Sequence, residues 1–221
     1  MSALQLEAGS VAALTRFVAA QLDNIVPAEG REIDEATVGD LLPAALARMA
    51  PVLEAVRSFT PGRFNHLNSL QHTTLLYLLS NEQWRRHGPG PVADRLFCLN
   101  RALNAIDLFY AVQMPQVFFI SHGLGAVLGN AVYGDRLVVF QNVTVGRVGN
   151  DRPTLGTDVV LYPGATVTGN AVVGDRSVIA AGTVVHGTQV PPDSIATSEG
   201  GSLVIRPRRR DYAALYFRPA G

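Results

Sequence analysis

The sequence predicts a helical domain at residues 1–105, a parallel β-helix of hexapeptide repeats at 106–195 and a C-terminal tail at 196–221. Two observations predict this class. From Leu108 to Val190, aliphatic residues recur every six positions, whereas the residues before 105 divide into helical segments separated by proline and glycine. A period of six matches neither a helix nor alternating strands. It is typical of a chain that coils, so that each coil covers the hydrophobic face of the previous one.

The first helical segment is expected from Ser10, a candidate N-cap, to Asp23. Its apolar face would carry Val11, Leu14, Val18 and Leu22. A turn at residues 27–30 follows, and a second segment is expected from 34 to 59, with Asp34 as cap and with interruptions at Pro43 and Pro51.

A third helix is expected from Ser69 to Arg86, because His-Gly-Pro-Gly-Pro follows as a stop signal. Pro91 suits the first position of a fourth helix that reaches about Ala105. Cys98 lies in the apolar part of this fourth helix, so we expect it to be buried as a small hydrophobic residue.

In the repeat region, nearly every six-residue step falls on an aliphatic residue. The steps are Leu108, Met114, Ile120 and Ala126, then after one extra residue Tyr133, Val139 and Val145, then after a longer break Leu155, Leu161, Val167, Val173, Ile179 and Val185. A second small or aliphatic residue follows four positions later at Val143, Val159, Ala165, Ala171, Ser177 and Thr183. Three hexads make one triangular coil whose step residues point inward.

Glycines follow several steps directly, at Gly134, Gly146, Gly156 and Gly174, and are expected to relieve backbone strain at turns. Pro191 and Pro192 are expected to end the coil. The alternative fold is a β-sandwich, which does not hold a six-residue phase over a dozen steps.

Composition excludes several classes of function. The formal charge is zero, so no basic excess predicts binding to nucleic acid or to an anionic membrane. The N-terminus lacks the pattern of a signal peptide, and we expect no apolar run of membrane-spanning length. The single cysteine excludes an internal disulfide and favours a reducing, cytoplasmic location.

His122 and Asp107 are the candidate catalytic pair. His122 follows a step residue by two positions, where its side chain is expected to leave the core near a corner. Asp107 lies 15 residues earlier, close to one coil of 18, so its carboxylate is expected near the imidazole. A carboxylate on one ring nitrogen fixes the tautomer and leaves the other nitrogen as a general base. The structural alternatives are a solvated loop histidine and an aspartate that caps a turn.

These residues resemble the serine acetyltransferase family of hexapeptide-repeat acyltransferases. The family's Asp-His-Ala-Thr-Gly stretch resembles Ser121-His122-Gly123-Leu124-Gly125, and its helper aspartate precedes the histidine as Asp107 does. The family's Val-Thr-Leu-Gly-Gly, Asp-Arg-His-Pro and Gly-Ala-Gly-Ser-Val-Val runs resemble residues 143–147, 151–153 and 180–185. The resemblance covers about 105 to 205.

The resemblance implies a left-handed coil, a trimer or dimer of trimers, and acetyl transfer from acetyl-CoA to serine or a related small hydroxylated acceptor in a ternary complex. His122 would be the general base and Asp107 its orienting partner. Ser121 and Arg152 would bind the acceptor. The coenzyme would contact Gly146, Arg147, Gly164, Ala165, Ala181 and Gly182. No metal is implied, and the coil holds only two histidines, too few for a three-histidine zinc site.

Three departures from the family pattern concern the substrates. Ser121 replaces an aspartate that helps to hold the amino acid, the loop histidine beside Arg152 is absent, and Tyr162-Pro163 replaces a Gly-Ala pair on the coenzyme path. The chain ends in Arg218-Pro-Ala-Gly221 and lacks the family's terminal isoleucine, so a complex with cysteine synthase is not expected. The alternatives are acylation of a sugar or another amino alcohol, or a non-catalytic scaffold.

Overall fold

The computed structural model describes residues 4–28 and 35–219, which fall into two compact units. The helical unit holds the described residues up to Glu54, together with Phe59–Ala105 and Phe109–Ala111. The solenoid unit holds Ala55–Ser58, Ile106–Leu108 and the described residues from Val112 onward. The fold class predicted from the sequence, helices followed by a left-handed parallel β-helix, is confirmed.

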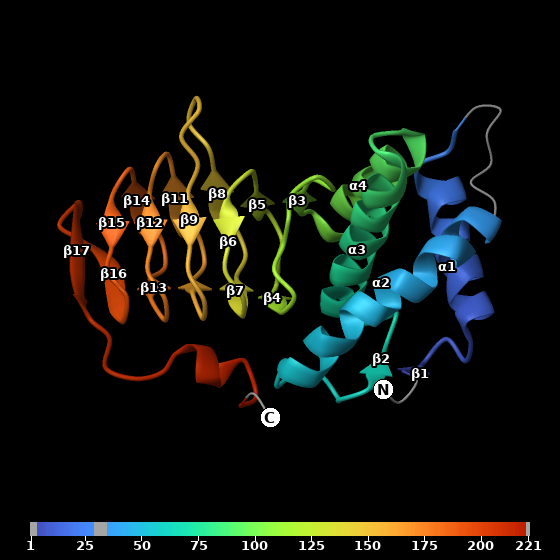
Figure 1. The fold of residues 1–221 in the computed structure, drawn as a ribbon, viewed down its shortest axis with the longest axis horizontal. Coiled ribbons are helices and arrows are strands. Elements are labelled where there is room, and N and C mark those ends of the chain that lie inside the picture. The colour runs from blue at the N-terminus through green and yellow to red at the C-terminus, as the bar shows by residue number, and fades with distance from the viewer. Residues whose placement is uncertain (1–3, 29–34, 220–221) are drawn as a thin grey trace. The chain divides into compact units, whose positions relative to one another are not determined.

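Four helices form the helical unit: α1 Val11–Ile25, α2 Glu35–Ala55, α3 Ser69–His87 and α4 Pro91–Asn104 (Figure 1). The unit also contains two short strands, β1 Gln5–Leu6 and β2 Arg63–Phe64, which pair with each other in parallel. Every residue of α3 from Gln71 to Asn81 is buried, so α3 is the centre of this unit.

Two of the helix starts predicted from capping residues are confirmed in this unit. The Ser10 side chain accepts a hydrogen bond of 3.1 Å from the Ala13 amide, and Pro91 occupies the first turn of α4, as predicted. The predicted apolar face of α1 is buried at Leu14, Val18 and Leu22, but Val11 is 42% exposed, because it begins the helix. The predicted cap Asp34 lies outside the described residues.

Two expectations about α2 were wrong. The helix is continuous through Pro43 and Pro51, although each proline lacks the N–H of one helical hydrogen bond. Buried neighbours such as Leu42, Met49 and Val52 pack this helix on the rest of the unit, and this packing overrides the local preference. Among the described helices, α2 also reaches membrane-spanning length and apolarity, contrary to our expectation, but eight of its residues are buried within the unit, as in a core helix.

Cys98 is exposed, so its predicted burial was wrong. The buried face of α4 contains Ala93, Leu96 and Leu99, which follow one another at three-residue intervals. Cys98 lies on the other side of the helix, because the apolar stretch in the sequence is wider than the face that the fold buries.

Below about pH 6.5, we expect the helical unit to lose stability because of His72. Burial, helped by nearby His66, lowers the pKa of His72 from 6.5 to about 4. Its Nε2 lies 3.0 Å from Oε1 of Gln21, which accepts the Nε2–H, and its Nδ1 faces Nδ2 of Asn104 at 3.5 Å, a donor that suits the neutral ring. The unfolded chain binds a proton below its ordinary pKa while the folded chain does not, so stability is complete above pH 6.5 and falls toward pH 4, by at most on the order of 3 kcal/mol.

The single tryptophan, Trp84, lies in α3 and reports this unit by fluorescence during urea unfolding. His72→Gln keeps a neutral polar side chain and should flatten the loss of stability between pH 6.5 and 4. An unchanged pH dependence in this variant would assign the effect to other groups.

Three parallel sheets form the solenoid. The first contains β4 Phe118–Ile120, β7 Leu137–Val139, β10 Val160–Leu161, β13 Val178–Ile179 and β16 Ser194–Glu199, with β17 Ser202–Pro207 added antiparallel. The second contains β3 Asp107–Leu108, β5 Val127–Leu128, β8 Thr144–Gly146, β11 Thr166–Thr168 and β14 Val184–His186. The third contains β6 Val132–Tyr133, β9 Thr154–Leu155, β12 Val172–Val173 and β15 Gln189–Val190.

The predicted inward phase is confirmed at almost every step. The step residues are buried except Met114, which is half-buried, and the second set from Val143 to Thr183 is fully buried. One step was misassigned. Leu128, and not Ala126, is in register with Val145 in the second sheet, so the extra residues precede β5 and do not follow it. The stack also continues beyond Pro192, because β16 pairs in parallel with β13.

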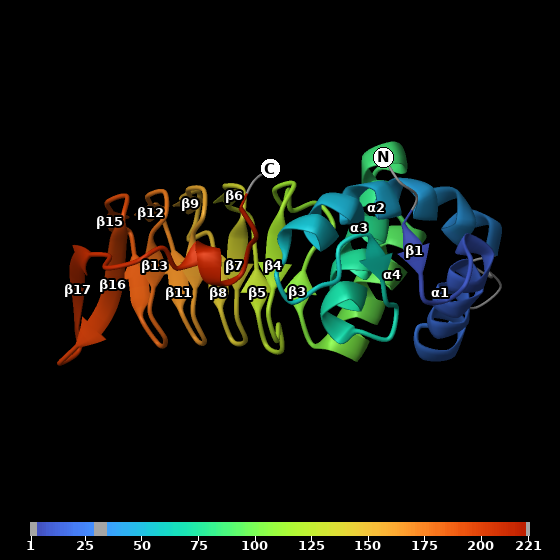
Figure 2. The same cartoon turned by 90° about the horizontal axis from the view of Figure 1, so that it is seen from below.

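The C-terminal tail runs back along the first sheet, as both views of the ribbon show (Figures 1 and 2). Phe217 is fully buried under the guanidinium of Arg136, 4.9 Å from the ring centroid, and Arg57 Nε donates to the carbonyls of Ala214 and Phe217. Val138 and Val160 of the first sheet, each preceding a step residue, are accordingly fully buried. The corresponding Val184 of the second sheet is 55% exposed.

Candidate active site

The corner that leads from the first sheet to the second holds His122, and we call residues 121–126, 140–143, 162–165 and 180–183 the His122 corner. Each coil turns here through a residue with positive φ, at Gly125 (72°), Asn142 (57°), Gly164 (70°) and Gly182 (66°). The Asn142 amide donates to the Leu124 carbonyl (2.9 Å), and Gly182 donates likewise to Pro163 (2.9 Å). These bonds hold successive coils together along the corner.

His122 lies on an expansion of this corner. The turning residue Gly125 comes five positions after Ile120, whereas Asn142 comes three positions after Val139, so the first coil carries two extra residues. His122 is exposed, has a φ of 52°, and its carbonyl accepts a 2.8 Å hydrogen bond from the Leu124 amide. The corner therefore presents the imidazole outside the regular path of the coil.

Gly123 fixes the shape of this expansion. A Cβ at this position would overlap Cγ2 of Ile120 and would lie 3.5 Å from Cδ1 of Ile106. The backbone after His122 thus passes directly over the side chains of the step residue and of the residue before Asp107.

Asp107 lies next to the same corner. It begins β3, is in register with Val127, and its amide donates a 2.9 Å hydrogen bond to the carbonyl of Ala126. Ile106, its neighbour, approaches Gly123 as described above. The structure therefore brings the chain at Asp107 and the chain at His122 together in adjacent coils, although 15 residues separate them in sequence.

Ser121, the predicted acceptor-binding residue before His122, is nearly buried. It is only 6% exposed, and its amide donates a 2.7 Å hydrogen bond to the Val139 carbonyl. The role of its hydroxyl in holding an acceptor stays a prediction.

The six residues predicted for the coenzyme fall into two groups. The first group lies on the His122 corner, in its third and fourth coils, and contains Gly164, Ala165, Ala181 and Gly182. Gly146 and Arg147 lie at the opposite edge of the second sheet, where β8 ends, and the predicted acceptor residue Arg152 closes the loop that follows. The outward face of the second sheet, with Thr144, Thr166 and Thr168 half-buried, connects the two groups.

Tyr162 belongs to an aromatic cluster that sequence reasoning did not predict. Its ring stacks on Phe140 at 5.3 Å and 24°, and its hydroxyl accepts a 3.2 Å hydrogen bond from Tyr216 of the tail. Burial, and then this hydrogen bond, raise the pKa of Tyr216. The signal in the sequence was that Phe140 and Tyr162 both directly follow step residues.

Three arginines of the arginine-rich tail make contacts within the solenoid unit. Arg206 pairs with Glu199, Arg208 lies 2.9 Å from Asp193, and Arg210 lies 4.8 Å above the ring of Tyr212. These contacts hold the tail within the solenoid unit. No group of three or more potential ligands among histidine, cysteine, aspartate and glutamate gathers into a metal site in the described ranges.

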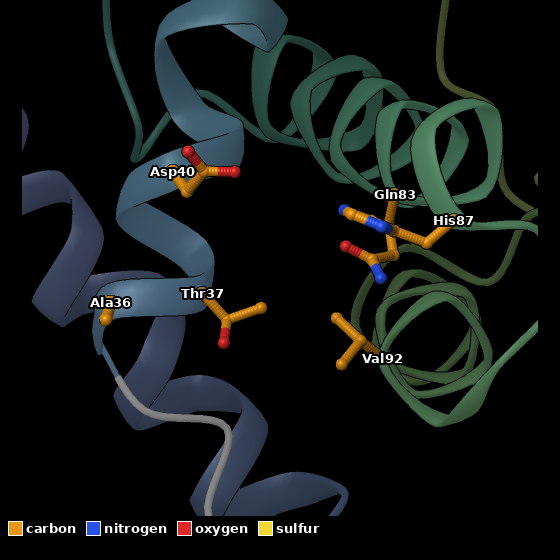
Figure 3. Close-up of a pocket in the computed structure, with 6 residues that line it drawn as sticks. All are labelled: Ala36, Thr37, Asp40, Gln83, His87 and Val92. Carbon is orange, nitrogen blue, oxygen red and sulfur yellow. The ribbon is translucent and has the colours of Figure 1, made fainter.

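The helical unit contains an open pocket of about 490 Å³, and no predicted site residue is among those that line it. Thr37 and Asp40 line it from α2, Gln83 and His87 from α3, and Val92 from α4 (Figure 3). Asp40 is engaged by Arg86, whose Nη1 lies 2.8 Å from the carboxylate.

Comparison with known proteins agrees with the repeat architecture. Residues 152–187 match the bacterial transferase hexapeptide (six repeats) family. The serine acetyltransferase of Synechococcus elongatus is 36% identical over 122 residues, which are 52% of this chain and 50% of that protein. The chain spans about half the length of the curated relatives it matches.

Solved structures share the fold. A serine acetyltransferase from Vibrio cholerae superposes with a TM-score of 0.71 at 20% identity, covering 91% of this chain and 81% of that one. A serine acetyltransferase in complex with CoA gives a TM-score of 0.70 at 21% identity, over 87% and 84% of the two chains.

The repeat, its three-sheet coil and these similarities define a hexapeptide-repeat protein of the left-handed β-helix class. Within that class the chain is similar to serine acetyltransferases over about half of its length, as the residues around His122 had suggested.

Proposed function

We propose that this protein is an acetyl-CoA-dependent O-acetyltransferase that acts on serine or a related small hydroxylated acceptor through a ternary complex. His122 is the general base, and Asp107 orients its imidazole. Arg152 and Ser121 contribute to acceptor binding. The observation that carries the proposal is the expanded corner, which exposes His122 beside the coil that holds Asp107.

The reaction in this proposal is a direct transfer. His122 takes the proton of the acceptor hydroxyl as its oxygen attacks the thioester carbonyl. A C–O bond forms, the C–S bond breaks, and the proton passes from the imidazolium to the departing thiolate of CoA. Backbone N–H groups near the corner would stabilise the oxyanion.

The substrate assignment draws on the relatives' names. Curated relatives are called serine acetyltransferases, and one similar structure holds CoA. Gly164, Ala165, Ala181 and Gly182 lie on the same corner as His122, which supports their assignment to the coenzyme together with Gly146 and Arg147.

Exposed valines support a homotrimer or dimer of trimers. Val127 (41%) and Val184 (55%) face outward from the second sheet, and Val132 (43%) and Val172 (39%) from the third. The first sheet is covered by the tail instead. We place the activity in the cytoplasm.

The acceptor screen follows thiol release from acetyl-CoA with small hydroxylated compounds. We expect turnover with at least one of them. Serine should be a weak acceptor with a high KM, because Ser121 is neutral and nearly buried and cannot supply the charge that an ammonium group prefers. A sub-millimolar KM for serine would contradict this view of the acceptor site. Absence of turnover with every acceptor would favour a scaffold.

A further inference from the structure

Tyr162 is the first residue of a turn that carries two of the residues predicted for the coenzyme. The Ala165 amide donates a 3.0 Å hydrogen bond to the Tyr162 carbonyl, and Gly164 between them has a φ of 70°. The corresponding turn of the next coil begins at Ala180, whose carbonyl accepts in the same way from the Thr183 amide (3.1 Å). An alanine therefore suits this position, and the turn does not need the ring of Tyr162.

The Tyr162 ring lies on the side of the first sheet, where two other rings hold it. It stacks on Phe140 of the preceding coil, with ring centroids 5.3 Å apart and planes at 24°. Its hydroxyl accepts a 3.2 Å hydrogen bond from the hydroxyl of Tyr216, in the tail that runs along this sheet (Figure 2). Tyr216 also meets the Phe140 ring edge to face at 5.6 Å. The stack and the hydrogen bond thus favour one and the same position of the Tyr162 ring.

The backbone around Tyr216 is itself anchored. The Tyr216 carbonyl accepts a 2.7 Å hydrogen bond from the Arg57 amide. The next residue, Phe217, is fully buried and forms an antiparallel bridge with Val56. On the other side, Arg57 Nε donates a 2.8 Å hydrogen bond to the carbonyl of Ala214. The ring of Tyr216 is therefore a fixed support for the side chain that it contacts.

We propose that Tyr216 is a positioning residue for the coenzyme, because it holds the Tyr162 ring on Phe140 and so keeps this ring off the turn that the coenzyme contacts. A tyrosine side chain has three staggered χ1 positions, and the observed one gives the stack. A rotation of χ1 takes the ring off Phe140, and from the first position of the turn the ring can then cover Gly164 and Ala165. This inference rests on the proposed function in placing the coenzyme at these two residues.

The size of the effect depends on the fraction of molecules in which the ring lies on Phe140. The coenzyme binds only this fraction, so its apparent dissociation constant rises as the fraction falls. Loss of the Tyr216 hydroxyl removes one hydrogen bond, which changes such an equilibrium by roughly fivefold. Loss of the whole Tyr216 ring also removes the edge contact and has a larger effect. The chemical step should not change, since neither Tyr162 nor Tyr216 takes part in proton transfer.

Calorimetric titration with CoA measures this binding without turnover. We expect Tyr216→Ala to weaken CoA roughly tenfold or more, and Tyr216→Phe to weaken it less. Tyr162→Ala should bind CoA as tightly as wild type. Tyr162→Ala added to Tyr216→Ala should restore the affinity, because no ring is left to cover the turn. Tyr212→Ala is the matched control and should bind like wild type, since Tyr212 lies in the same tail but contacts Arg210 instead.

The restored affinity separates positioning from a loss of structure. If Tyr216→Ala merely loosened the solenoid, the second substitution would weaken CoA further, and that result would overturn the inference. Weaker binding in Tyr162→Ala alone would also overturn it, because the ring would then be a contact of the coenzyme. In steady-state kinetics, Tyr216→Ala should raise the KM for acetyl-CoA and leave kcat and the acceptor KM near wild type. A fall in kcat with an unchanged KM would contradict positioning.

Fluorine NMR of the protein labelled with fluorotyrosine tests the ring position without any coenzyme. The Tyr162 resonance, identified by its loss in Tyr162→Phe, should move toward that of an exposed tyrosine in Tyr216→Ala, as the ring leaves the face of Phe140. Such a change in a protein whose wild type does not bind CoA would leave the held ring intact and remove the proposed function. An unmoved resonance would remove the positioning role of Tyr216 and leave the proposed function unaffected.

Discussion

Replacing His122 should lower kcat by about 10²–10⁴-fold and leave the affinity for acetyl-CoA nearly unchanged. In the proposed mechanism His122 only moves a proton, so the loss falls on the chemical step. The side chain is exposed, so its removal should not disturb the core. Because the residue has a φ of 52°, His122→Asn is the better variant, since asparagine tolerates this conformation and cannot act as the base. His122→Ala serves as the second variant.

Asp107→Asn separates orientation from proton transfer. It should lower kcat clearly but less than His122→Asn does, because the base itself remains. Thermal unfolding of both variants should match wild type. Wild-type turnover in His122→Asn, with thiol release measured at saturating substrates, would remove His122 from the mechanism.

The sequence predicted the solenoid well where the repeat is regular. Val145, Val167 and Val185 recur at intervals set by the coil, and all three are fully buried. At the His122 corner the same reasoning misplaced a step, because Ala126 is as buried as Leu128 and hydrophobicity alone does not distinguish them. Only the register between strands shows that the two extra residues fall around the histidine.

The remaining errors have tertiary causes. Pro43 and Pro51 are strong local signals against a helix, but the packing of α2 outweighs them. Phe217 and Arg136 form a buried contact across 81 positions of sequence, and no local pattern predicts such a pairing. The loop after β8 closes through backbone hydrogen bonds between Val148 and Asp151, which residue types do not specify.

The second large effect is expected from substituting a glycine that follows a step residue, because these glycines allow the close spacing between coils. They were expected to relieve strain at turns, but Gly134, Gly156 and Gly174 do not have positive φ. They are required for space instead. A Cβ on Gly134 would overlap the carbonyl group of Gly156 and come within 2.7 Å of the Thr157 amide nitrogen, both in the next coil. Parallel strands stack about 4.8 Å apart, and their hydrogen bonds leave no room for a methyl group there.

Gly134→Ala should therefore destabilise the solenoid by roughly 3 kcal/mol or more. The atoms that the new methyl group would meet belong to the backbone of the next coil, which cannot rotate aside as a flexible side chain could. For a unit of this size the melting temperature would fall by about 10 °C. Gly146→Ala is the matched control. Gly146 also follows a step residue, yet its Cβ would meet nothing within 4 Å and its φ is not positive. Its stability should stay within about 1 kcal/mol of wild type. Circular dichroism during heating measures both, and equal melting temperatures would show that the coils separate easily enough to admit a methyl group.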